Sequence, residues 1–116
     1  MIEFKYKQLI VWQKSKVLVK MVYEATEHLP KSEEFILKNQ LRRAAVSVCS
    51  NIAEGSSRKS LQERKRFYEI ARSSAIEIDA QLELCITLNY TVEDTIEELN
   101  KILLEVFKML SKMIDQ

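Results

Sequence analysis

The sequence predicts an all-α protein that folds as an up-down-up-down antiparallel four-helix bundle. Three observations support this fold class. The 116 residues include one glycine and one proline, a composition typical of long helices. Apolar residues recur at the spacing of one helical face in four successive segments. The connections between these segments are short, and helices joined by short connections pack antiparallel.

The first helix is predicted over residues 9–29 and the second over residues 33–54. Pro30 ends the first segment, because proline cannot continue a helix. Ser32 is a candidate N-cap for the second helix. Gly55, the only glycine, is predicted to be the left-handed residue that follows the end of this helix.

The third helix is predicted over residues 61–89 and the fourth over residues 92–114. Ser60 and Glu63 form a predicted capping box, in which the Ser60 hydroxyl accepts from the Glu63 N–H and the Glu63 carboxylate accepts from the Ser60 N–H. Thr91 is a candidate start for the fourth helix. We expect the four helices to form one domain, residues 1–116.

Small side chains are concentrated in the middle of the second and third helices. They allow two backbones to approach closely, so these helices are predicted to be the tightest pair. The small residues are Ala44, Ala45, Ser47, Cys49, Ser50 and Ala53 in the second helix and Ala71, Ser73, Ser74 and Ala75 in the third.

Apolar residues in the first and fourth helices exceed what one core stripe needs. Two explanations are open. A small bundle exposes some apolar surface in any case. Alternatively, the excess is buried against identical subunits, and we favour this homo-oligomer.

The order of the charges is more informative than the net charge of +1. Residues 38–72 have a net charge of +6 and residues 73–116 a net charge of −6. In the predicted topology, fourteen basic and six acidic residues share the half of the bundle that contains the turn between the second and third helices. We call the end of this half the basic pole. Such a pole attracts phosphate backbones, although sorted surface charges or subunit contacts would also explain the pattern.

Several kinds of chemistry are not expected from this sequence. A single histidine, His28, does not supply the paired Glu-x-x-His motifs of a di-iron bundle. Cys49 and Cys85 are predicted to lie too far apart for a disulfide or a shared ion. Asn51 and Glu54 are the most enzyme-like polar group, but an interhelical hydrogen bond or ion pair is the better explanation. We therefore expect no catalytic residues, no metal and no cofactor.

No segment has the roughly 20 apolar residues that a membrane-spanning helix needs. The N-terminal stretch carries lysines within its apolar run and lacks a cleavage site of small residues. We therefore expect a cytoplasmic protein with no membrane partner.

Four stretches of the chain resemble a known family. They are LIVWQKS (9–15), QLRRAAVSVCSNIAEGSSRKS (40–60), FYEIARSSAIEIDAQLEL (67–84) and LNY (88–90). The pairing of the LRRAAVS run with NIAEG is the most specific element. In these motifs the chain resembles the four-helix-bundle proteins encoded within intervening sequences of bacterial large-subunit (23S) ribosomal RNA genes.

The resemblance implies a ring-shaped homo-oligomer, commonly a pentamer. A related branch of the family is the accessory variability determinant of diversity-generating retroelements, a basic barrel that binds nucleic acid and a reverse transcriptase. The resemblance thus implies RNA or DNA as a partner, and a reverse transcriptase as a further possibility.

From these observations we predict a non-enzymatic oligomer that binds RNA or another nucleic acid through its basic pole. The alternative is a protein-protein interaction or scaffold module. In the retroelement branch such a module would be accessory to a reverse transcriptase. The predicted phosphate contacts are Arg58, Lys59, Arg64, Lys65 and Arg66, with Arg42, Arg43 and Arg72 extending the patch or serving subunit contacts.

Overall fold

The computed structural model describes residues 1–116 and contains four long α-helices and no strand. The helices are α1 (Ile10–Thr26), α2 (Leu37–Ser56), α3 (Leu61–Thr87) and α4 (Glu97–Ile114). Three short 3₁₀ turns, Lys5–Gln8, Lys31–Glu33 and Glu93–Ile96, lie between or before them. The all-α four-helix fold predicted from the sequence is confirmed.

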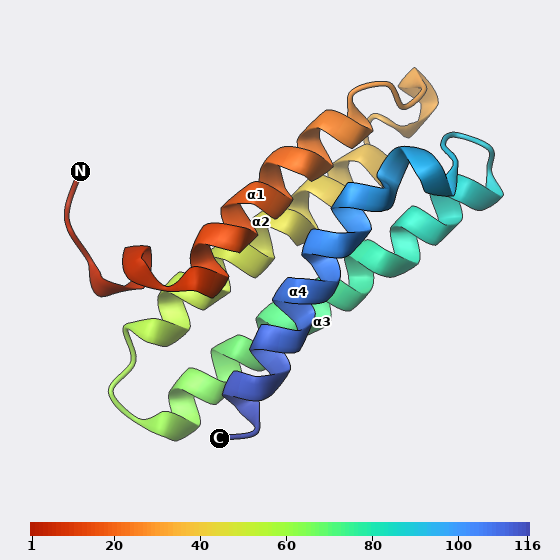
Figure 1. The fold of residues 1–116 in the computed structure, drawn as a ribbon. Helices are drawn as coiled ribbons and strands as arrows, with labels where there is room; N and C mark the ends of the chain where they lie inside the picture. The colour runs from red at the N-terminus through yellow and green to blue at the C-terminus, as the bar shows by residue number, and fades with distance from the viewer.

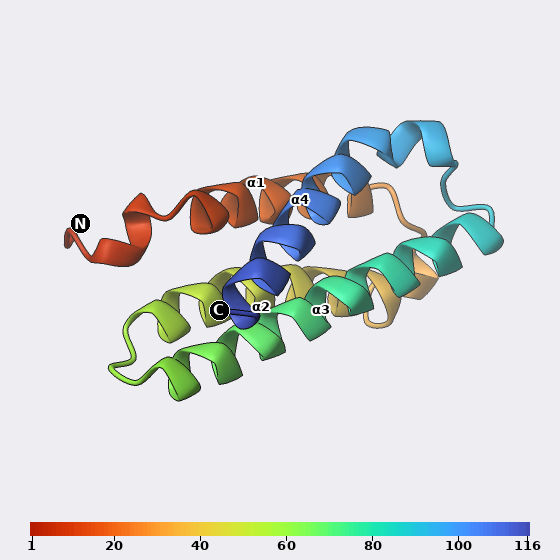
Figure 2. The ribbon, with the colours of Figure 1, turned by 60° about the horizontal axis from the view of Figure 1, so that its bottom comes forward.

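The helices run alternately up and down (Figure 1). α1 packs against α2 and α4, and α3 packs against the same two helices. The α2–α3 turn and the C-terminus lie at one end of the bundle, and the other two connections lie at the opposite end (Figure 1). α4 crosses its neighbours at a visible tilt (Figure 2).

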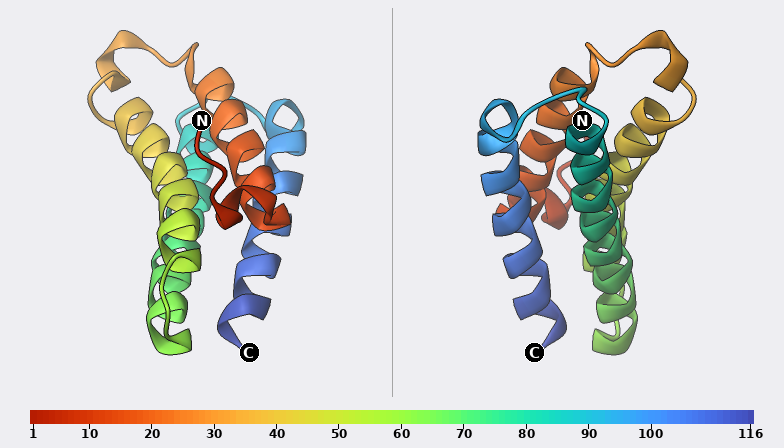
Figure 3. Two further views of the ribbon diagram at one scale, coloured as in Figure 1. Left: turned by 90° about the vertical axis from the view of Figure 1, so that its left-hand side faces the viewer. Right: turned by 90° about the vertical axis from the view of Figure 1, so that its right-hand side faces the viewer.

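α2 and α3 make the most extensive contact of any helix pair, and they run side by side along their length (Figure 3). The small residues in their middle explain this, because short side chains let the backbones approach. A hydrogen bond from Ser74 Oγ to Ser47 Oγ, 2.9 Å long, fixes the register of the two helices.

One cluster of twenty buried apolar residues forms the core. Each helix contributes its predicted stripe, and Leu18, Ile52, Ile78 and Leu110 are among the side chains with no exposed surface. Burying a side chain of this size stabilises the fold by about 1.5–3 kcal/mol. The core lies along the bundle axis and holds both ends of the molecule in fixed positions.

The prediction for Gly55 is wrong. Gly55 is helical, one residue before the end of α2, and its φ is not positive. Its backbone faces α3, and a Cβ there would lie 2.7 Å from Tyr68 Cε1 and 3.0 Å from Phe67 Cβ. The sequence needs glycine here because α3 approaches too closely for any side chain.

The left-handed residue is instead Asn89, with a φ of 61°. It follows α3, where the Asn89 N–H donates to Ile86 O and the Tyr90 N–H donates to Cys85 O. These two bonds form a Schellman motif, which satisfies the last carbonyls of the helix. Asparagine tolerates this conformation better than most residues.

The starts of α2 and α4 also differ from the prediction. Ser32 does not cap α2, since it lies in a 3₁₀ turn and α2 begins at Leu37. Thr91 does not start α4, which begins at Glu97 after another 3₁₀ turn. A tertiary contact joins the two connections at this end: the Tyr90 hydroxyl donates to Glu33 Oε2 at 2.8 Å.

Candidate nucleic-acid interface

The α2–α3 turn at the basic pole is held by hydrogen bonds to its backbone. Arg64 Nη1 donates to the carbonyl of Arg58 at 2.9 Å and to that of Lys59 at 3.0 Å. Ser60 Oγ accepts from the Glu63 N–H at 3.1 Å, which is the first bond of the predicted capping box. The reciprocal bond from Ser60 N–H to the Glu63 carboxylate does not form. Arg64 therefore shapes the turn, and part of its guanidinium is already used within the chain.

Arg58 is also engaged within the chain. Its Nη2 lies 2.9 Å from Glu54 Oε2, and its guanidinium lies 4.8 Å from the centre of the Phe67 ring. Both partners are on the surface, and an exposed i,i+4 ion pair is worth about 0.3–0.5 kcal/mol. A phosphate could compete for this guanidinium, but it would have to displace Glu54.

Tyr68 lies under the turn and belongs to the core. Burial raises the pKa of its phenol above the usual value, and the nearby Arg64 opposes this rise. A buried ring cannot stack on a nucleic-acid base. The structure therefore gives Tyr68 a packing role in the core.

Two further predicted contacts tie α3 to α4. Lys65 Nζ donates to the carbonyl of the last residue, Gln116. Arg72 Nη1 donates to Ser111 Oγ at 3.2 Å. Both side chains are half-buried, and both positions lie in the half of the bundle that contains the α2–α3 turn.

Lys59 and Arg66 are the predicted contacts that stay free. Both are exposed, and neither side chain has a hydrogen bond or an ion pair. Lys108 and Lys112 of α4 are likewise exposed and unpaired in the same half. These two lysines are among the fourteen basic residues predicted for this half but are not among the predicted phosphate contacts. They could have been predicted from the topology, because the end of α4 and the start of α3 lie at the same end of the bundle.

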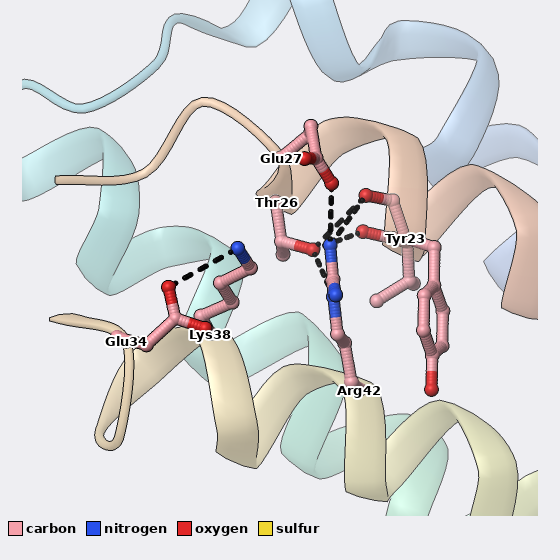
Figure 4. Close-up of polar contacts among 7 residues, drawn as sticks. Tyr23, Thr26, Glu27, Glu34, Lys38 and Arg42 are labelled. Carbon is pink, nitrogen blue, oxygen red and sulfur yellow. Dashed lines mark hydrogen bonds and ion pairs between the residues drawn. The ribbon is translucent and has the colours of Figure 1, made fainter. Parts of the chain in front are cut away.

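Arg42 contradicts the prediction (Figure 4). It lies beside the end of α1, at the opposite pole, where its Nε donates to Thr26 Oγ1 at 2.9 Å. Its Nη2 donates to Tyr23 O at 3.1 Å and pairs with Glu27 Oε2 at 3.0 Å. The guanidinium also lies 4.4 Å from the centre of the Tyr23 ring. Arg42 thus links α1 to α2 and is not available to a phosphate.

Arg43 lies on the same turn as Arg42 and therefore also outside the basic pole, although it is exposed and unpaired. Both arginines lie in the first half of α2, which is the half beside the end of α1. Without them, the basic half has twelve basic and six acidic side chains, a net charge of +6. The other half has six basic and eleven acidic side chains, a net charge of −5.

Asn51 and Glu54 do not bridge helices, which corrects the prediction for this pair. Asn51 Nδ2 donates to the carbonyl and the hydroxyl of Ser47, four residues earlier in α2. Glu54 pairs with Arg58 across the helix end. Both side chains therefore make local contacts with residues four positions away along the chain.

The remaining reactive groups are dispersed. Cys49 and Cys85 are both free thiols. Burial raises the pKa of the Cys85 thiol, with a smaller contribution from the charge of Glu33. No three histidine, cysteine or acidic side chains come together as a metal site. No helix is long and apolar enough to cross a membrane.

The fold and the charge distribution together define an antiparallel helical bundle with one cationic end. The model of the 23S rRNA-intervening sequence protein family matches residues 7–112, and the chain belongs to this family. A crystal structure of a protein of unknown function from the S23 ribosomal protein family of Bacteroides thetaiotaomicron has a similar fold. It is 26% identical, with a TM-score of 0.84, and the match covers 92% of this chain and 100% of that chain. No curated protein matches the sequence.

Proposed function

We propose that this protein is a non-enzymatic, self-associating bundle that binds the backbone of RNA or DNA through its basic pole. The observation that carries the proposal is the separation of charge between the two halves of the bundle, +6 against −5. Lys59 and Arg66 supply cations that no internal partner neutralises. Cations of this kind displace counterions from phosphates, which gives affinity without sequence reading.

The predicted contacts divide into two groups under this proposal. Lys59 and Arg66 meet phosphate directly, together with Lys108 and Lys112. Arg58, Arg64, Lys65 and Arg72 have internal partners and serve first to hold the turn and the α3–α4 contact. Their charges still add to the field at the pole.

The test is binding of a structured ribosomal RNA fragment, measured by fluorescence anisotropy at several salt concentrations. We expect the affinity to fall steeply as salt rises. Reversing two charges in Lys59→Glu with Arg66→Glu should weaken binding at least tenfold. The matched control is Lys31→Glu with Arg43→Glu, because these side chains are also exposed and unpaired but lie in the other half. The control should change affinity by less than threefold.

Equal losses in the two double variants would contradict a site at the basic pole. Absence of binding by the unmodified protein at low salt would leave the alternative, a protein-interaction or scaffold module. The exposed apolar groove between α3 and α4 favours that alternative. Recovery of a reverse transcriptase with the protein from nuclease-treated lysate would connect it to the retroelement branch.

A ring-shaped assembly and a cytoplasmic location belong to the same proposal. Exposed apolar side chains on α1 and α4, including Ile10 and Leu104, support the assembly. Two free thiols, Cys49 and Cys85, are usual in a reducing compartment.

A further inference from the structure

The N-terminal arm, residues 1–9, lies beside the end of α2, and a pocket separates the two. The pocket has a volume of about 740 Å³, within the range of about 300–1,000 Å³ that is typical of ligand sites. Phe4, Lys5 and Tyr6 of the arm form one wall, and side chains between residues 50 and 57 form the other. The arm and the α2–α3 turn lie at the same end of the bundle (Figure 2). The pocket is therefore at the basic pole.

The arm carries a row of aromatic rings. The rings of Phe4 and Tyr6 are stacked with their centres 6.1 Å apart, and the Tyr6 ring meets Trp12 of α1 edge to face at 4.8 Å. Tyr6 and Trp12 are half-buried, whereas Phe4 is 54% exposed. Tyr6 is thus held between two rings, and Phe4 ends the row in solvent. An exposed ring of this kind is a platform on which another planar group can stack.

Hydrogen bonds hold the arm in this position. Gln13 Nε2 of α1 donates to the Lys7 carbonyl at 3.0 Å. The Lys7 N–H donates to the Phe4 carbonyl at 3.2 Å, and Lys7 Nζ donates to the Ile2 carbonyl. The arm is therefore ordered before a ligand arrives, and this order lowers the entropic cost of binding.

The charges around the pocket suit an uncharged group inside it and phosphates outside. Glu54 lines the pocket, and its carboxylate would repel a phosphate that entered. Lys5 lies on the arm, and Lys59 follows two residues after Ser57 of the opposite wall. Both lysines are exposed, and neither has a partner within the chain. A planar uncharged group between two phosphates is what a nucleotide in a single strand presents.

The polar atoms of the α2 wall are hydrogen-bond acceptors. The Ser56 hydroxyl donates to the Ala53 carbonyl at 2.9 Å. The Ser57 hydroxyl donates to the Glu54 carbonyl at 2.7 Å. Both hydroxyl oxygens can then only accept from a ligand, as can the Glu54 carboxylate oxygen that does not pair with Arg58. Cytosine, adenine and guanine have amino groups that donate, whereas uracil and thymine have none, so the wall favours a base with an amino group.

We propose that this pocket binds an unpaired base of single-stranded RNA or DNA, stacked on Phe4, with Lys5 and Lys59 at the flanking phosphates. The inference rests on the proposed function and names the class of nucleic acid that the basic pole binds. Bases in a duplex are paired and stacked on one another, so only an unpaired base can reach the ring. Bases with an amino group bind more tightly than uracil or thymine.

The test compares three single-stranded probes by fluorescence anisotropy at low salt. They are an oligocytidylate, an oligouridylate and an abasic strand, each of about ten nucleotides, a length within the site size of small nucleic-acid-binding domains. All three carry the same phosphate charge, so differences in affinity come from the bases. Stacking on one ring should make the oligocytidylate bind about 5- to 100-fold more tightly than the abasic strand. The oligouridylate should lie between them, and deoxyribose versions of the probes show whether the site prefers RNA or DNA.

Variants of exposed side chains assign the effect to the ring. Phe4→Ala should remove the difference between the oligocytidylate and the abasic strand, whereas Phe4→Trp should retain it. The matched control is Phe35→Ala, because Phe35 is 88% exposed and precedes α2 at the opposite end of the bundle. It should keep all three affinities. Circular dichroism checks that each variant is folded.

A separate variant tests the phosphate contact. Lys5→Gln should weaken binding of all three probes by the same factor, because it removes a cation and leaves the aromatic row in place. A loss confined to the oligocytidylate would contradict the assignment of Lys5 to a phosphate.

Three results would overturn the inference: equal affinity for the oligocytidylate and the abasic strand, equal affinity for the oligocytidylate and the oligouridylate, or unchanged discrimination in Phe4→Ala. In each case salt-sensitive binding of the abasic strand would leave the proposed function standing, because that function requires only phosphates. If no probe binds at low salt, the proposed function fails together with the inference.

Discussion

The two ends of the bundle both contain arginines, but the arginines have different surroundings. Arg42, at the acidic end, contacts two side chains, a carbonyl and an aromatic ring of α1. At the basic end Arg64 contacts two carbonyls of the turn, whereas Arg66 projects into solvent. Carbonyls left unpaired near helix ends and turns attract guanidinium groups. The number of arginines near a helix end therefore overstates the charge that a ligand can meet.

At the basic end, the largest effect on stability is expected from Gly55→Ala. Alanine usually stabilises a helix relative to glycine, but here its Cβ would lie 2.7 Å from Tyr68 Cε1. We expect the variant to lose about 1–3 kcal/mol of unfolding free energy, measured in urea. In a Tyr68→Ala background the same change should cost much less. An equal cost in both backgrounds would contradict a clash with the ring.

At the acidic end, Arg42→Ala should lower the unfolding free energy by roughly 2 kcal/mol, because hydrogen bonds that involve a charge are stronger than neutral ones. Arg43→Ala is the matched control, because Arg43 is adjacent to Arg42 in α2 but its side chain has no partner. Its effect should stay within about 0.5 kcal/mol. Similar losses in the two variants would show that Arg42 does not link α1 to α2.

A smaller effect is expected at Asn89, also at the acidic end. The backbone at this residue is left-handed, with a φ of 61°. This conformation disfavours any residue with a Cβ unless its side chain gains a local hydrogen bond. Asn89→Ala should cost about 1 kcal/mol, while Asn89→Gly should cost nothing or stabilise slightly. Chemical denaturation measures both, and a larger loss for glycine than for alanine would contradict the prediction.

The smallest effect concerns pH and the bond that joins the two connections of the acidic end. The hydrogen bond to Glu33 raises the pKa of the Tyr90 phenol above its usual value near 10. Because the folded state favours the protonated phenol, the stability from this bond is present below pH 10. It is lost as the pH rises through the raised pKa. The stability difference between the unmodified protein and Tyr90→Phe should therefore shrink as the pH rises above 10, and a difference independent of pH would contradict this.

Much of the fold could be predicted from local sequence patterns. Leu99, Leu103, Val106 and Leu110 recur at three- and four-residue spacing in the sequence, and all four are buried. Ser60 caps the start of α3, as its position before Glu63 predicts. These features depend on local periodicity and capping, which do not require knowledge of the neighbouring helices.

The candidate site could be predicted only in part. Lys59 and Arg66 are free, as a phosphate contact needs, but Arg42 has partners on another helix. The sequence does not reveal a partner that lies sixteen residues away along the chain. Arg42 and Arg43 lie in the first half of α2, beside the end of α1, and therefore belong to the far half of the bundle.

The sequence by itself determined the number of helices, their apolar faces and the position of the α2–α3 turn, because these follow from periodicity and from residues that favour caps and ends. Only the tertiary structure decided why Gly55 is glycine and which arginines are free. A missing side chain suits both a left-handed turn and a close helix contact, so the distance to Tyr68 was needed to distinguish them. The height of a charge along the bundle depends on the register between helices, which is set by contacts between residues far apart in the sequence.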